Sequence, residues 1–576
     1  MLAYYYPKIK FAVIHGKQIV THPFALRGGK SMLKKIGSLI LTVSLMTAIL
    51  AGCGSKEDST TQSTQTASSE DENIVVQEDT NTQESDPYAE HLTFEIFTID
   101  GSEDMVNYPL VKEACEKFNF DFSIQLVAWD NWDDVTRTLA ATDSFPEVIA
   151  WYNLSYTEYA EWAREGVFKA LPSDLSAYPN LNALVEKYSI FDKVLVDGEL
   201  YAFPKIKNNN PFNEYESYMF AYRRDWASQM GLDYAPVQDL TWDEFIEYLE
   251  LVKEKDPGQL GDKLIPFDLE HGGNSWCGLA KKWNAQIAGY KLEDGKYVWG
   301  ALDPSSMDAI LEIKDMYDKG LLAADSYTDA NNAGRERFLA GRSAVYYGNL
   351  GPSVLQDTAK LMSTNIEGFT EEDLGLFTIK MDDGKYHVGQ MDEWWGAFAF
   401  SHDCRDEVMD RWLAVGNWLL EEEQIEKYAY GIPEEDWTKA EDGTITLNYT
   451  PEDAASGGSK DYITNQKPFQ KLFILEGMDL FLEGNPNTSQ YVIEDLFKKN
   501  MEVWASNPSY TPNDYDVNYF SSPEKDAFAS ILGGTKDNFI QAVISDDPQG
   551  MWDKFIQENE EQAAKACEEI NAAFGN

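Results

Sequence analysis

Three neighbouring segments decide the class of fold: HLTFEIFT at 91–98, YPLVKEACEKF at 108–118 and FDFSIQLV at 120–127. Polar and apolar residues alternate in the first and third segments, as in half-buried strands, whereas the middle segment carries apolar residues at helical spacing. A helix at 132–141 and a short apolar strand at 147–151 continue the series. Strands separated by helices form βαβ units, whose right-handed crossover requires a parallel sheet. We therefore predict an α/β fold.

The composition is that of a large acidic protein with ample apolar material for a core. The 576 residues include 98 Asp and Glu against 47 Lys and Arg, a net charge of −51, and 43% are hydrophobic. A chain of this length and composition is expected to form two or more folded domains. Its charge repels nucleic acid and anionic membrane surfaces. Five Cys residues are too few for a disulfide-built scaffold.

The basic N-terminus has the organisation of an export signal. Residues 1–52 contain seven Lys and Arg and no acidic residue. From Met32, two lysines precede an apolar run at 36–50 that is too short to span a membrane comfortably. Leu-Ala-Gly-Cys then follows, ending at Cys53, and resembles a bacterial lipobox. We predict a lipoprotein signal peptide at 32–52 and attachment of diacylglycerol to Cys53.

Two segments flank this signal. Residues 1–31 fit no part of it, and we expect translation to start at Met32, which makes 1–31 an untranslated or wrongly assigned extension. Residues 53–90 begin with the lipidated Cys and are rich in Ser, Thr, Gln, Asp and Glu. Such a composition buries too little apolar surface to fold. We predict a flexible tether there.

A series of motifs resembles one protein family. In chain order the series includes FPEVIAWYN (145–153), DGELYAFP (197–204), YMFAYRRDWASQMGL (218–232), TWDEFIEYLELVKEKDP (241–257) and RFLAGRSAVYYGN (337–349). Their order resembles the extracellular solute-binding proteins of ABC importers, family 1. The subset that they resemble is the maltose-binding-protein-like lipoproteins of Gram-positive bacteria.

The resemblance implies a type II periplasmic-binding-protein-like fold with two α/β lobes, a hinge and a ligand cleft between the lobes. We assign 91–215 plus 376–428 to lobe one and 219–374 plus 429–576 to lobe two. The chain is expected to cross between them near 215–220 and again near 374–379.

Ligands of open α/β sheets bind beyond the carboxyl ends of the strands. With the resemblance, this geometry selects loops rich in Trp and in acidic or amide side chains. The expected ligand-binding residues are Trp129, Asp130, Trp151, Tyr152, Asn153, Asn274, Trp276, Asn349, Asp392, Glu393, Trp394 and Trp395. Flat rings cover the apolar faces of a pyranose while carboxylates and amides bond its hydroxyls, so the expected ligand is an oligosaccharide. For each Trp, packing in the core is an equally good interpretation. Five further Trp residues lie in helix-like stretches and are expected in the core: Trp242, Trp412, Trp418, Trp504 and Trp552.

The resemblance further implies a monomeric receptor without catalytic residues or cofactor. It would deliver sugar to the permease subunits of an ABC importer, held by its lipid on the outer face of the cytoplasmic membrane of a Gram-positive bacterium. Many relatives carry a calcium loop after the helix that ends near Asp256, but KEKDPGQLGDKLIP lacks the alternating oxygen ligands, so no metal is expected. Two alternatives remain: a secreted glycoside hydrolase, and a receptor for peptides or other cationic solutes.

Overall fold

The computed structural model describes residues 87–99, 103–128, 131–152, 156–206, 215–324, 326–330, 332–390, 392, 394–448, 472, 494–511 and 514–575. The expected signal peptide, Cys53 and nearly all of the tether lie outside the described residues. No helix within the described ranges is long and apolar enough to cross a membrane.

The first sheet follows the sequence prediction closely. Its strand order is β2 (Phe120–Val127), β1 (Leu92–Ile99), β3 (Val148–Tyr152), β13 (Trp394–Phe400) and β4 (Ala202–Ile206). β1 pairs in parallel with β2 and β3, which confirms the predicted βαβ units, and β13 pairs antiparallel with β3 and β4. The helices of this region are α1 (Pro109–Phe118), α2 (Trp132–Ala141), α3 (Tyr156–Glu165), α4 (Pro179–Lys187), α5 (Ile190–Lys193) and α12 (Asp406–Leu419).

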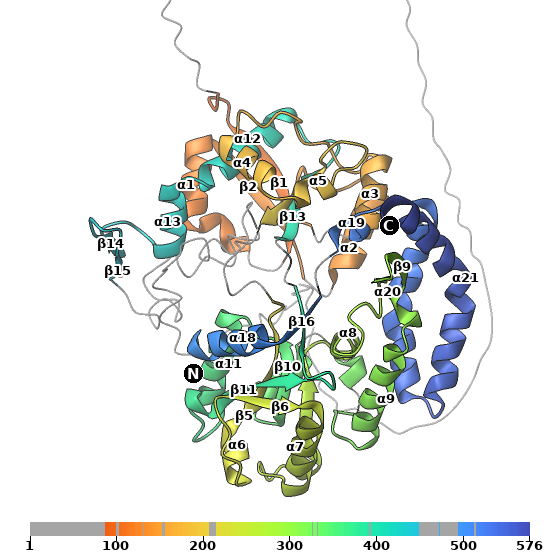
Figure 1. The fold of residues 1–576 in the computed structure, drawn as a ribbon. Helices are drawn as coiled ribbons and strands as arrows, with labels where there is room; N and C mark the ends of the chain where they lie inside the picture. Colours follow the sequence, from red (N-terminus) through yellow and green to blue (C-terminus); the bar gives the residue numbers. More distant parts are fainter. Residues whose placement is uncertain are drawn as a thin grey trace, which may run out of the picture. The chain divides into compact units, whose positions relative to one another are not determined.

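A second sheet has the order β6 (Val237–Thr241), β11 (Leu374–Lys380), β5 (Tyr218–Arg223), β10 (Ser343–Asn349) and β7 (Ile265–Leu269). Its helices include α6 (Arg224–Gln229), α7 (Trp242–Lys255), α8 (Gly272–Ala280), α9 (Ser305–Asp318), α10 (Ala333–Leu339), α11 (Pro352–Asn365) and α18 (Glu494–Ser506). The long helices α20 (Pro523–Ile544) and α21 (Pro548–Phe574) pack on each other, and α20 also packs on α8 and α9 (Figure 1).

Each sheet has its own apolar core, so the fold has two lobes. Trp412 and Trp418 belong to the core of the first sheet, and Trp242 and Trp552 to the core of the second. Trp504 lies in a third cluster on the other face of the second sheet, with Tyr215 and Tyr386. All five side chains are at most 4% exposed, which confirms their predicted place in the core.

The connections between the sheets lie side by side. The N-terminal part of the chain leaves the first sheet after β4, which ends at Ile206. It enters the second sheet with β5, which begins at Tyr218. β12 (Tyr386–Gly389) pairs in parallel with β16 (Pro508–Thr511). The Glu216 N–H donates to the Gly389 carbonyl at 3.0 Å, which brings the first connection against the second. A short helix, α19 (Tyr515–Asn518), follows β16, after two residues that are not described.

The second crossing lies later in the chain than the sequence indicated. Residues 374–379 were expected to cross, and residues from 376 onward were assigned to lobe one. Instead, β11 pairs with β5 and β6 inside the second sheet, and the chain joins the first sheet only at Trp394. β11 reads LGLFTIK and is buried over six of its seven residues. Such an apolar run is typical of an internal strand as well as of a crossing strand, so the pattern alone did not distinguish them.

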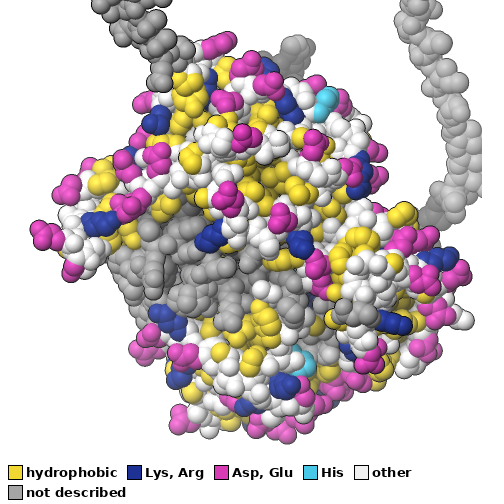
Figure 2. Space-filling model, turned by 45° about the horizontal axis from the view of Figure 1, so that its top comes forward, with side chains coloured by type: hydrophobic (Ala, Val, Ile, Leu, Met, Phe, Trp, Pro, Cys, Tyr) yellow, Lys and Arg dark blue, Asp and Glu magenta, His cyan; other side chains and the backbone are white. Residues whose placement is uncertain are grey.

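Between α12 and α18 lie α13 (Glu422–Tyr430) and a hairpin of β14 (Trp437–Lys439) and β15 (Ile445–Leu447). A second hairpin, β8 (Tyr290–Glu293) with β9 (Lys296–Trp299), packs against α21. Acidic side chains outnumber basic ones on the face seen in Figure 2, as the composition requires.

Candidate ligand-binding site

Two of the predicted Trp residues meet at the end of the first sheet. Trp151 of β3 and Trp395 of β13 have ring centroids 4.7 Å apart with planes at 74°. Trp151 is fully buried whereas Trp395 is partly exposed, so Trp151 supports the ring that faces outward. The ammonium group of Lys205 on β4 lies 4.7 Å from the Trp151 ring centroid, on the neighbouring part of the same wall.

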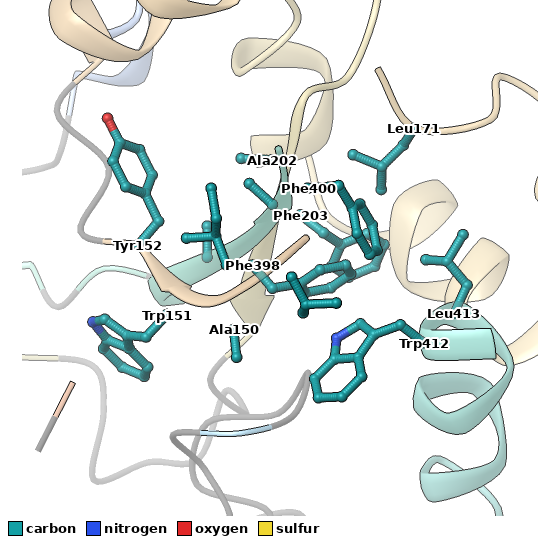
Figure 3. Packing of buried hydrophobic residues seen from close by; sticks show 14 of the residues in the cluster. Ala150, Trp151, Tyr152, Leu171, Ala202, Phe203, Phe398, Phe400, Trp412 and Leu413 are labelled. Atoms are coloured by element: carbon teal, nitrogen blue, oxygen red, sulfur yellow. The ribbon is translucent and has the colours of Figure 1, made fainter. Parts of the chain in front are cut away.

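A backbone irregularity creates this pairing. Gly396 has φ +69°, and an added Cβ there would lie 2.6 Å from the Trp151 ring. The register of β13 shifts on both sides of this residue, against β4 between Trp394 and Ala397 and against β3 between Ala397 and Ala399. Because a bulge re-aims side chains, it lets Trp395 turn toward Trp151. In Figure 3, Trp151 and Tyr152 leave β3 on opposite sides, as successive strand residues must.

The segment around α19 completes this wall. The Trp394 ring is 7% exposed and lies 6.2 Å from the ring of Tyr519. The Tyr515 hydroxyl donates to the Asp392 carboxylate at 3.4 Å. Asp516 forms an ion pair with Lys193 of α5. Tyr519 therefore packs against the first core, while Val517, two residues earlier, belongs to the second.

The second lobe contributes two neighbouring cavities. One of about 210 Å³ is lined by residues of α8, β12, β16 and α19, and another of about 300 Å³ by residues of α8 and α20. Both cavities are lined by Glu216, Gly278, Lys281 and Tyr347. The first also reaches Lys282, Gln390 and Thr511. The second also reaches Asn274, Tyr218 and Lys536.

The first cavity of this acidic protein contains a lysine, Lys282, whose pKa is lowered. Burial lowers the pKa of Lys282 to about 8, against the attraction of Glu216, which acts to raise it. The Lys282 ammonium group donates to the His387 carbonyl at 2.7 Å and lies 5.8 Å from the Trp504 ring centroid. Tyr347 has its pKa raised by burial, so its hydroxyl stays protonated at neutral pH and can donate a hydrogen bond.

Residues 106–389 match the family model of bacterial extracellular solute-binding proteins. The match covers just under half of the chain, and it confirms the predicted resemblance to this family.

Two curated relatives are similar to this chain over part of its length. Lipoprotein LipO of Bacillus subtilis is 26% identical over 219 residues, which are 37% of this chain and 41% of LipO. A lactose-binding protein of Rhizobium radiobacter is 27% identical over 177 residues, 29% of this chain and 37% of that protein. The matches thus span less than half the length of these relatives.

Solved structures have a similar fold over most of the length of this chain. The alginate-binding protein AlgQ2, solved without calcium ion, has a TM-score of 0.66 at 15% identity, covering 85% of this chain and 99% of AlgQ2. FusA of S. pneumoniae in complex with kestose has a TM-score of 0.61 at 14% identity, covering 84% and 99%. A solute-binding protein of Bifidobacterium longum infantis described as HMO-binding also has a TM-score of 0.61 at 14% identity, covering 84% and 100%. These likenesses confirm the predicted type II fold.

The residues that were predicted to bind the ligand lie in different environments in this chain. Tyr152 is 1% exposed, and Trp276 is fully buried against Tyr317 and Tyr327, with its indole N–H donating to Ser326 at 3.2 Å. In this structure neither ring offers a face to a ligand. Asn274 lines the second cavity, and Asn349 is exposed with its side-chain oxygen accepting the Gly351 N–H. Four predicted residues lie outside the described residues: Trp129, Asp130, Asn153 and Glu393.

Sequence reasoning did not select the charged residues of the cavities. Glu216 lies at a connection between the lobes, and Lys536 lies far away in α20, so no local motif marked them. Lys281 and Lys282, however, lie just after the glycine-rich stretch HGGNSWCG (271–278), which contains the selected Asn274 and Trp276. A pair of basic residues beside a candidate ligand loop, in a chain this acidic, was the available signal.

The loop after α7 does not fit a calcium ion in this structure. Asp256, at the end of the helix, accepts hydrogen bonds from the backbone N–H groups of Leu260 and Gly261 at 2.9 and 2.8 Å. Both carboxylate oxygens of Asp256 thus cap the turn. The absence of a metal there stays a prediction.

Proposed function

We propose that this solute-binding protein is the lipid-anchored receptor of an ABC importer and captures an oligosaccharide. The observation that carries the proposal is the Trp151–Trp395 pair, in which a buried ring holds a partly exposed ring at the edge of the first sheet. An exposed indole of fixed orientation provides an apolar platform for one face of a pyranose.

The second lobe supplies the polar half of such a site. Three polar side chains line these cavities and can exchange hydrogen bonds with sugar hydroxyls: Asn274, Glu216 and Tyr347. A sugar held on the Trp395 platform and bonded by the second lobe would bind the closed arrangement of the lobes more tightly than the open one. That difference in affinity is what drives closure.

Replacing Trp395 by Ala tests the platform. We expect affinity for the bound oligosaccharide to fall at least about tenfold, because one stacking ring contributes about 1–3 kcal/mol, while the unfolding midpoint stays close to that of the wild type. Isothermal titration calorimetry of residues 87–576 against a panel of soluble oligosaccharides measures the affinity. Scattering at saturation should show compaction of the wild type.

The control is Trp394→Phe, since Trp394 is buried against Tyr519 and does not form the outward face. Wild-type affinity in Trp395→Ala would contradict the platform. Release of shorter sugars from the titrated oligosaccharide would favour the glycoside hydrolase instead.

A further inference from the structure

The net charge of the residues that line the two cavities described above is opposite in sign to that of the whole chain. From Cys53 onward the chain has 98 acidic residues and, after subtraction of the seven basic residues before it, 47 − 7 = 40 basic ones. The two cavities together are lined by Lys281, Lys282 and Lys536 against Glu216 and Asp514. Basic side chains are therefore in excess in the lining of these two cavities. In the chain from Cys53 onward, by contrast, acidic residues outnumber basic ones more than twofold.

Asp514 does not neutralise these lysines directly. One of its carboxylate oxygens accepts the Tyr297 hydroxyl at 2.7 Å, and the other accepts the Val517 N–H at 3.2 Å. Asp514 lines only the first of the two cavities. Among the described residues that line the second cavity, Glu216 is the acidic one, and Lys281 and Lys536 line the same cavity.

Packing of α8 on α20 brings Lys281 and Lys536 to the same cavity. An added Cβ at Gly273 of α8 would lie 2.4 Å from the Ile540 side chain of α20, so the two helices approach closely there. Lys536 lies four residues before Ile540, on the same face of α20. Lys281 lies at the C-terminal end of α8. The second cavity is lined by both lysines and by Asn274.

Both ammonium groups act on one buried neighbour. The pKa of the Cys277 thiol is raised by burial, and the positive charges of Lys281 and Lys536 act in the opposite direction. Their charges thus converge on the cavity wall that contains Cys277. Among the residues that the structure describes, neither lysine forms an ion pair, whereas Lys291 and Lys319 in the same lobe each pair with two carboxylates.

We propose that the ligand is an acidic oligosaccharide, whose carboxylate lies between Lys281 and Lys536 while Glu216 and Asn274 bond neighbouring hydroxyls. The inference rests on the proposed function and specifies its ligand class. It also argues against a peptide or other cationic solute, because such a ligand would meet the excess of lysines. The negative net charge of the chain therefore does not predict the sign of the charge that lines these two cavities.

The test compares two ligands that differ only in charge. The probes are short oligomers of galacturonate, glucuronate, mannuronate or guluronate, each beside the same oligomer with its carboxylates reduced to hydroxymethyl groups. We expect at least one oligouronide to bind at least about tenfold more tightly than its reduced counterpart, because hydrogen bonds to charged groups are the stronger class. Its affinity should fall as salt is raised, and that of the neutral oligomer should not.

Variants assign the effect to the two lysines. Lys281→Gln and Lys536→Gln should each weaken oligouronide binding about tenfold and weaken binding of the reduced oligomer much less, because charged hydrogen bonds are the stronger class. Lys263→Gln, an exposed lysine in the turn at 261–263, is the matched control and should leave both affinities unchanged.

The outcomes separate the inference from the proposed function. Equal binding of both oligomers, or a preference for the reduced one, would overturn the acidic ligand and keep the oligosaccharide receptor. Binding of a polyamine or a basic peptide, with no binding of any oligosaccharide, would overturn both.

Discussion

At the scale of single residues, Lys282 has the most perturbed charge in the candidate site. Its pKa is about 8, below the usual 10.5 of a lysine, because burial disfavours the ammonium form. The titratable groups around it are Glu216, Lys281, His387 and Asp514, all in the lining of the same cavity. A bound carboxylate would favour the ammonium form and so raise this pKa.

This linkage predicts a pH dependence of ligand binding. Below about pH 7 Lys282 is already protonated and the affinity for an oligouronide should be constant. As pH rises through about 8 the protein without ligand loses that proton, and binding must recover it. Affinity should therefore fall by up to about tenfold per pH unit until the pKa of the complex is reached.

Calorimetric titrations between pH 7 and 9.5, in buffers with different ionisation enthalpies, measure both the affinity and the proton uptake. Lys282→Met keeps most of the aliphatic stem and should flatten the profile. A wild-type affinity that is constant or rises over this range would contradict the linkage.

The Trp residues show what could be predicted at this scale. The sequence selected Trp151, Trp395 and Trp276 as ligand contacts. Trp151 and Trp395 do meet, but Trp151 and Trp276 are both fully buried and the Trp395 ring is partly exposed. Burial depends on contact with distant residues, such as Tyr317 and Tyr327 around Trp276, and the local sequence pattern does not contain that information.

At the scale of elements, prediction succeeded where local chemistry defines the structure. Thr241 followed three residues later by Glu244 is the sequence pattern of a capping box, and the structure contains that box. Asp-Gly at 197–198 is typical of a tight turn, and both residues lie in the left-handed region, with Val196 and Glu199 exchanging backbone hydrogen bonds. The bulge in β13 was not predicted, because it depends on the approach of Trp151 from another strand.

Substitution of Gly396 tests how much the bulge contributes to the free energy of unfolding. Gly396→Ala should lower the free energy of unfolding by about 1–2 kcal/mol for the positive φ and by about 1–3 kcal/mol more for crowding against Trp151. Gly166→Ala is the matched control, since its φ is +79° but no atom lies within 4 Å of the added Cβ. It should lose the first contribution alone.

Urea unfolding followed by tryptophan fluorescence measures both variants. Ligand affinity should fall in Gly396→Ala, because Trp395 is re-aimed, and should be unchanged in Gly166→Ala. Equal stability losses in the two variants would show that the Trp151 contact does not constrain Gly396.

At the scale of the whole molecule, charge and attachment act in opposite directions. The chain from Cys53 carries 98 acidic and 40 basic residues, a net −58, by the same subtraction of seven basic residues. An anionic membrane repels such a body, so the proposed attachment would depend on the lipid that we predict on Cys53. Two or more acyl chains anchor a protein stably, since each buried CH₂ contributes about 0.8 kcal/mol.

The proposed anchor predicts where the protein fractionates. In a Gram-positive host, the wild type should remain with membranes through a wash in 1 M salt and be released by detergent, because apolar burial holds it. Cys53→Ser should be absent from the membrane fraction, because it carries no lipid and an anionic membrane repels its negative charge. Mass spectrometry of the wild type should find an acylated Cys53 as its first residue. Retention of Cys53→Ser on washed membranes, or release of the wild type by salt, would contradict the lipid anchor. Oligosaccharide affinity of the soluble chain should be the same in both cases, because Cys53 is not among the residues of the proposed ligand site.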